Sequence, residues 1–123
     1  MLAIDVEKNG DVAVVRLNGR LVRGEEVRIL RSAVVAEKCS RIVVLDLSDV
    51  ESLDAGGLTT LLGLHHWSKS HGVQLKLVNP SRFVHEIFAR TRLDKVFDIS
   101  RLDHALYVLS GVDREHMRYA ASC

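Results

Sequence analysis

The sequence predicts a single α/β domain, in which a mixed sheet of about five strands opens with an N-terminal hairpin and is flanked by about four helices. The chain has 123 residues, 47% of them hydrophobic, and one proline, which is typical of one globular domain. Along the chain, apolar runs typical of strands alternate with apolar stripes at helical spacing. The predicted order is ββαβαβαβα, with residues 1–111 forming the domain and residues 112–123 a polar C-terminal tail.

The first elements are a hairpin and a helix. Apolar and polar residues alternate over residues 3–7, β-branched residues recur within 12–17, and Asn9 with Gly10 between them is the strongest short hairpin signal. A helix is predicted from Glu25 to about Lys38, because acidic residues suit its first turn and apolar residues recur on one face.

The central strand and the second helix are separated by one unusual loop. The β-branched run at 42–45 is typical of a parallel strand covered on both faces. A helical stripe runs from Leu58 to His65, Gly72 ends it, and Asp54 is its predicted N-cap. The loop at 46–57 therefore joins the carboxyl end of a strand to a helix N-terminus, where open α/β sheets gather their ligands. It is the candidate functional site.

The remaining elements are shorter. Alternation over 73–77 predicts a strand, and Asn79 with Pro80 predicts the cap and first position of a third helix with an apolar stripe over 83–88. A last strand is predicted at 93–99. Ser100 and Asp103 resemble a capping box that opens a fourth helix to about residue 109.

Charge and motif content exclude several classes of function. Seventeen Lys and Arg against 16 Asp and Glu give a net charge of +1, so no basic footprint for nucleic acid is present. No apolar stretch approaches the roughly 20 residues that span a bilayer, and residues 1–10 do not resemble a signal peptide. A cytoplasmic protein that is not embedded in a membrane is expected. No catalytic motif occurs, so a protein that is not an enzyme and has no catalytic residues is expected.

The histidines do not predict a metal site. His65, His66 and His71 are separated by one, five and six positions, whereas ligands on one helix face lie three or four apart. His65 is predicted to be a half-buried core residue, and the other two to be solvated. His85 begins a zinc-protease pattern, but Ala89 stands where the second histidine is required. Neither a metal nor a cofactor is expected.

The start of the second helix allows two interpretations. Gly56 and Gly57 expose backbone N–H groups at the positive end of a helix dipole, where an anion could be held. Alternatively, Asp54 caps the helix and the glycines let it pack closely against the sheet. The residues alone leave both open, although the Lys-Ser/Thr pair of a phosphate-binding P-loop is absent.

Residues 42–62 resemble the signature of STAS domains, a family that includes bacterial anti-sigma factor antagonists and cytoplasmic modules of sulphate transporters. In that signature an apolar strand ends in Asp-Leu-Ser, a short loop reaches Asp-Ser-Ser/Ala-Gly, and a Leu-rich helix begins. Residues 15–21 resemble the family's opening strand and turn, with Val22 where an aspartate is usual, and residues 79–98 resemble its third helix and last strand. The resemblance covers nearly the whole chain and implies the same order of elements.

The resemblance implies a non-enzymatic module for transcription regulation and signal transduction in bacteria. Its partner would be an anti-sigma factor of the histidine-kinase-like ATPase type, or another sensor component. That kinase phosphorylates a serine directly after the signature aspartate. Here the aspartate is Asp54, the acceptor position is Ala55 and the next position is Gly56, so neither carries a hydroxyl. Such a protein would behave as if permanently dephosphorylated.

The resemblance places partner binding at Asp54, Ala55, Gly56, Gly57 and Leu58. Ser52, Thr59 and Thr60 are alternative phosphoacceptors, although none matches the motif. The protein is expected to be a monomer or a weak dimer. Two other functions are kept as alternatives, namely a STAS domain that binds a nucleotide or another anion, and a STAS subunit of a transport complex.

Overall fold

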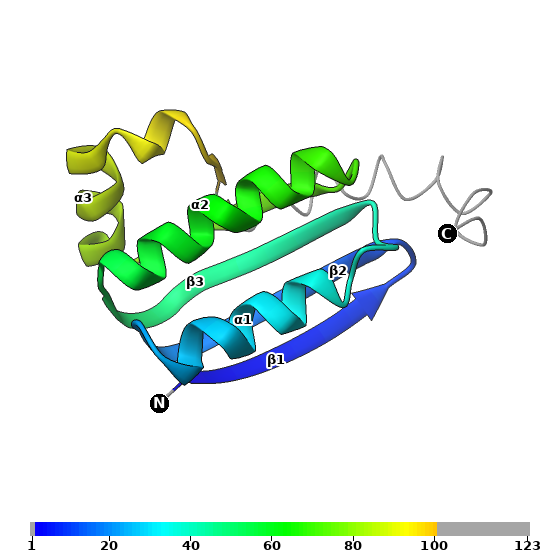
Figure 1. Ribbon diagram of the computed structural model, residues 1–123, viewed down its shortest axis with the longest axis horizontal. Coiled ribbons are helices and arrows are strands. Elements are labelled where there is room, and N and C mark those ends of the chain that lie inside the picture. Colours follow the sequence, from blue (N-terminus) through cyan, green and yellow to red (C-terminus); the bar gives the residue numbers. More distant parts are fainter. Residues whose placement is uncertain (1, 101–123) are drawn as a thin grey trace.

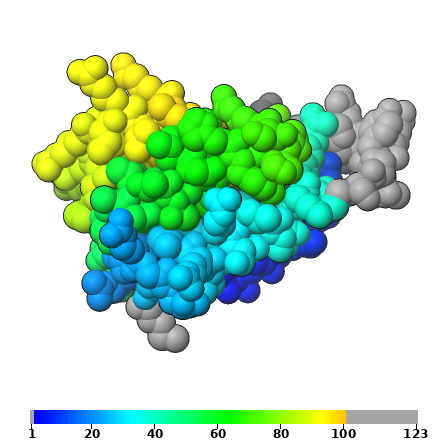
Figure 2. Space-filling view, in the orientation of Figure 1, coloured from blue at the N-terminus to red at the C-terminus, as the bar shows by residue number. Residues whose placement is uncertain are grey.

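The computed structural model describes residues 2–100, which form a five-stranded mixed sheet with two long helices lying side by side across one face (Figures 1 and 2). The spatial order of the strands is β1-β2-β3-β4-β5, with β1 antiparallel to β2 and the others parallel. The predicted α/β class and the N-terminal hairpin are confirmed. The bounds are β1 Leu2–Asn9, β2 Val12–Leu21, α1 Glu25–Val35, β3 Ile42–Leu53, α2 Ala55–Ser70, β4 Gln74–Val78, α3 Arg82–Thr91, a short 3₁₀ helix Leu93–Lys95 and β5 Asp98–Ser100.

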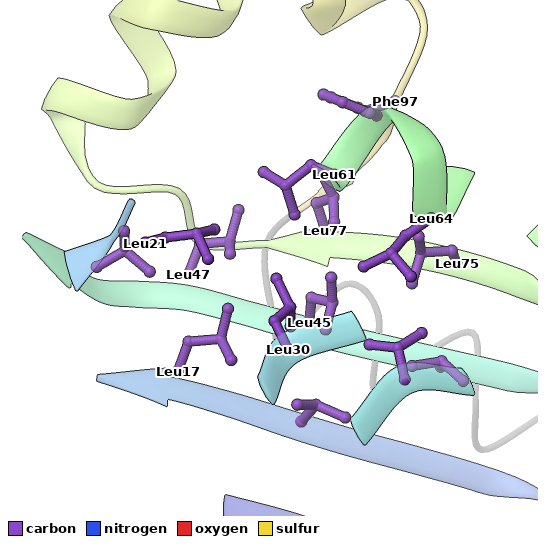
Figure 3. Packing of buried hydrophobic residues seen from close by; sticks show 14 of the residues in the cluster. Leu17, Leu21, Leu30, Leu45, Leu47, Leu61, Leu64, Leu75, Leu77 and Phe97 are labelled. Atoms are coloured by element: carbon purple, nitrogen blue, oxygen red, sulfur yellow. The ribbon is translucent and has the colours of Figure 1, made fainter. Parts of the chain in front are cut away.

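One large apolar core lies between the sheet and the helices (Figure 3). Alternate residues of the strands point into it, and the inward faces of α1, α2 and α3 close it. Leu61 of α2 is 1% exposed, and Leu58 and Leu62 pack half-buried against the same cluster. A smaller buried cluster lies on other strand positions, at Val12, Ile42, Val44 and Val78.

The central strand is longer than the sequence predicts. Residues 46–53, which the sequence predicts to form most of a loop, continue β3 and pair with β2, which itself extends to Leu21, so that Leu53 lies opposite Leu21. The polar residues of this segment make it look like a loop in the sequence. A register shift between Asp46 and Asp49 accommodates them in the strand. The predicted twelve-residue loop is therefore reduced to one residue, Asp54, between β3 and α2.

Three other boundaries differ from prediction. The first helix ends at Val35 instead of Lys38. Ser81, not Asn79, caps α3, because its hydroxyl accepts the Val84 N–H at 3.3 Å whereas Asn79 has a φ of 51°. The predicted strand at 93–99 begins only at Asp98, because residues 93–95 form a 3₁₀ turn.

The predicted fourth helix and the polar tail at 112–123 lie outside the described residues. None of the helices within residues 2–100 is long and apolar enough to cross a membrane.

Candidate functional site

The N-terminus of α2 is fixed by Asp54, the only residue between β3 and the helix. Asp54 has extended backbone angles, and its carboxylate accepts the Gly57 N–H at 2.8 Å. This contact satisfies one of the N–H groups that the first turn of a helix leaves without a partner. The predicted N-cap is confirmed.

The same carboxylate also holds the turn between β2 and α1. The backbone N–H of Arg23 donates to both carboxylate oxygens of Asp54, at 3.0 and 3.1 Å. The two turns meet because Leu21 and Leu53 are paired, so that β2 and β3 finish at the same edge of the sheet. Sequence reasoning missed Arg23, since it precedes Asp54 by 31 positions and only the full length of the two strands indicates the contact.

These contacts keep Asp54 negatively charged. Hydrogen bonds from Gly57 and Arg23 lower the pKa of the Asp54 carboxyl below its ordinary value of 3.8. A fixed negative charge therefore lies at the exposed start of α2 at neutral pH.

Both glycines are required by close packing, as the second interpretation of the sequence proposed. A Cβ at Gly57 would overlap the carbonyl oxygen of Leu21 and lie 2.8 Å from the Leu53 side chain. A Cβ at Gly56 would lie 2.7 Å from Cβ of Arg23. Any larger residue at either position, including a serine at 56, therefore requires the turn at Arg23 or the end of β2 to move.

The site residues differ in how far they reach solvent. Ala55 is exposed at the first position of α2, Leu58 is half-buried against the core, and Gly57 is buried. Among the alternative phosphoacceptors, only Thr59 is exposed. Ser52 is half-buried at the end of β3, and the Thr60 hydroxyl donates to the Gly56 carbonyl at 2.8 Å.

The histidines lie apart from this site. His65 is 9% exposed and contacts Phe97 edge to face, which confirms that it belongs to the core. His66 and His71 are exposed. Within residues 2–100 no three His, Cys, Asp or Glu side chains group closely enough to hold a metal ion.

Comparison with known proteins gives one family and several similar structures. The family model described as STAS domain matches residues 3–105. An anti-sigma factor antagonist from Mycobacterium paratuberculosis is 26% identical, with a TM-score of 0.76 over 89% of this chain and 95% of its own. A protein from Thermotoga maritima, proposed to be an anti-sigma factor antagonist, is 24% identical, with a TM-score of 0.77 over 87% of this chain and 94% of its own.

A third similar structure is that of the anti-sigma factor antagonist SpoIIAA of Bacillus in its unphosphorylated form. It is 19% identical, with a TM-score of 0.73 over 89% of this chain and 97% of its own. At this identity the likeness shows the fold alone, and that fold is the one described above.

Proposed function

This chain belongs to the STAS domain family, and on that premise we propose that it is a non-enzymatic regulatory module that binds a protein partner through the surface at Asp54, Ala55, Gly56, Gly57 and Leu58. The partner we propose is an anti-sigma factor of the histidine-kinase-like ATPase type, or another sensor component, in the bacterial cytoplasm. The fold resembles that of anti-sigma factor antagonists. The observation that carries the proposal is an exposed Ala55 on a helix start that Asp54 and Arg23 hold in place.

The site is preorganised for binding. Asp54 joins the turn at Arg23 to the first turn of α2, and both glycines are in close contact with neighbouring backbone. A partner would therefore meet a surface that is already ordered, so little conformational freedom is lost on binding. Ala55 presents a small, exposed apolar group on this surface.

The proposed module has no phosphoserine switch. Ala55 provides no hydroxyl, and close packing against Arg23 keeps Gly56 from being replaced by serine without a local movement. Phosphorylation at these positions therefore cannot release the partner. We expect binding to be controlled by the amount of this protein or by the state of the partner.

The alternative of anion binding at this helix start has less support. The Asp54 carboxylate already accepts the Gly57 N–H, and its negative charge lies where an anion would approach. An additional anion would meet like-charge repulsion there.

The proposal is tested by identifying the partner and then asking whether it phosphorylates the protein. The tagged protein should retain an ATPase of the histidine-kinase-like type or a sensor component from an extract of its source organism, and the purified partner should bind in titration calorimetry. Incubation with that partner and ATP should give no phosphopeptide covering residues 52–60. Such a phosphopeptide, or a purified partner that does not bind, would contradict the proposal.

A further inference from the structure

A hollow of about 420 Å³ lies at the other end of α2, between the last turns of that helix, β4 and residues 96–98. It exists because β5 starts opposite Lys76, so that within the described residues Gln74 and Leu75 have no strand on their outer side. The chain before β5 turns over α2 instead of extending the sheet. Phe97 is thereby placed 5.8 Å from the His65 ring and 5.2 Å from the Phe88 ring, measured between ring centroids.

Three nearly buried apolar side chains lie at the floor of the hollow, among polar side chains that contribute more of its surface. Val73, Leu75 and Phe97 line it and are 5 to 6% exposed, and Figure 3 shows Phe97 and Leu75 among the buried residues of the core. Val96 also lines it but is 42% exposed, so that a large part of its side chain remains in water. A ligand with an apolar body would remove this surface from water, which is favourable.

Among the described residues, the polar groups of the hollow leave the positive charge of Lys69 without an ion-pair partner. Lys76 is 15% exposed and forms an ion pair with Asp98 at 2.8 Å, so these two charges compensate each other. Lys69 forms no ion pair with any residue in 2–100. An anion beside Lys69 would compensate its charge.

His65 adds a hydrogen-bonding group beside Lys69. Burial, together with Lys69 and His66, lowers the pKa of the His65 imidazole below its ordinary value, which favours the neutral ring at pH 7. Its nitrogen atoms bond to no side chain or backbone group in the described part of the chain. A neutral imidazole offers one donor and one acceptor, and the donor suits a carboxylate oxygen.

From this combination we propose that the hollow binds a small organic carboxylate, with its charged end at Lys69 and His65 and its apolar body against Phe97, Leu75 and Val96. The volume lies within the range of about 300 to 1,000 Å³ that is usual for small-molecule sites. A single-ring or short-chain acid therefore fits the hollow better than a folded partner. Lys69 follows Asp54 by fifteen positions, or about 22 Å along the helix, so the ligand and the proposed protein partner occupy separate surfaces.

The experiment compares three probes on the full chain: benzoate, its neutral analogue benzamide, and inorganic phosphate. Binding is followed by the NMR signals of the His65 and Phe97 rings, with the exposed His85 as an internal reference. Benzoate should shift the first two signals saturably and leave His85 in place. Benzamide lacks the charge and phosphate lacks the apolar body, so each should bind about tenfold or more weakly.

Two variants at Lys69 separate its charge from its bulk. Lys69→Gln should weaken benzoate binding about tenfold and leave benzamide binding unchanged, whereas Lys69→Arg should retain benzoate. Lys38→Gln removes another exposed lysine and should have no effect. Lys69 is exposed, so these variants should remain folded, which their unchanged core signals would show.

Four outcomes would overturn the proposal. They are the absence of a saturable shift with benzoate, equal affinity for benzoate and benzamide, equal affinity for benzoate and phosphate, and a Lys69→Gln variant that binds benzoate as tightly as the original protein. None of these outcomes involves the protein partner, so the result is independent of the proposed function.

Discussion

The carboxylate of Asp54 accepts the backbone N–H of Arg23 at 3.0 and 3.1 Å, although 31 positions separate the two residues. This contact joins the turn after β2 to the start of α2. The same carboxylate caps the helix through Gly57. One side chain therefore sets both the beginning of the helix and the position of the neighbouring turn.

Removing the Asp54 carboxylate should destabilise the protein, and part of the effect should depend on pH. Asp54→Ala should lower the free energy of unfolding more than Asp54→Asn, because asparagine can still cap a helix. Hydrogen bonds lower the folded-state pKa of Asp54 below its ordinary value of 3.8, so its contribution is fully present above the unfolded-state pKa and is lost as the pH falls from there through the lower folded-state pKa. Urea unfolding between about pH 5 and pH 3 should show a steeper loss for the original protein than for Asp54→Asn. Parallel pH profiles would contradict this assignment.

Adding a methyl group at Gly57 should be much more damaging than adding one elsewhere on the same helix. Gly57→Ala places a Cβ against the Leu21 carbonyl oxygen and should cost about 1 to 3 kcal/mol by overpacking. Gly63→Ala is the matched control, because the nearest neighbour of its added Cβ is 3.8 Å away. It should stabilise the protein by about 0.5 to 1 kcal/mol through helix propensity. Equal effects in denaturant melts would show that α2 does not pack as described.

Truncating Leu61 should leave a cavity beneath α2. This residue is 1% exposed, so Leu61→Ala should cost about 2 to 5 kcal/mol. The control is Thr59→Ala on the exposed side of the same helix, which should change stability by less than about 0.5 kcal/mol. A loss in that small range for Leu61→Ala would mean that the helix does not face the core through this residue.

A negative charge at Ala55 should separate folding from binding. Ala55 is exposed in the first turn of α2, where the helix dipole favours an added carboxylate and the neighbouring Asp54 charge opposes it, so Ala55→Glu should change the free energy of unfolding by less than about 0.5 kcal/mol. Binding to the partner should weaken, because the added carboxylate imitates a phosphorylated site and would lose water without gaining a cation. A thermal melt and a calorimetric titration in one buffer measure the two effects.

Ala55→Gln is the control for side-chain size in that experiment, since it has similar bulk and no charge. It should bind more tightly than Ala55→Glu. Unchanged affinity for both variants would place the interface elsewhere on the molecule, and equal weakening would show that bulk, not charge, is responsible.

Local sequence patterns were sufficient to predict the class of the fold and the residue that caps α2. The Asn9-Gly10 turn, the β-branched run that begins at Ile42 and the capping Asp54 each depend on neighbours within a few positions. Short-range backbone geometry and side-chain spacing determine such features. The lack of a hydroxyl group at Ala55 was also visible from the sequence alone, because it is a matter of residue identity.

The length of β3 and the packing around the glycines were decided only by tertiary structure. Residues 46–53 are polar enough to suggest a loop, and they form a strand because an extended β2 pairs with their backbone groups. Position 57 likewise requires a glycine because a Cβ there would overlap the Leu21 carbonyl oxygen, which belongs to a distant part of the chain. The hollow at Lys69 exists because Phe97 turns over α2 toward His65. Contacts between distant segments determine all three features, and their energies depend on distances that local sequence patterns do not specify.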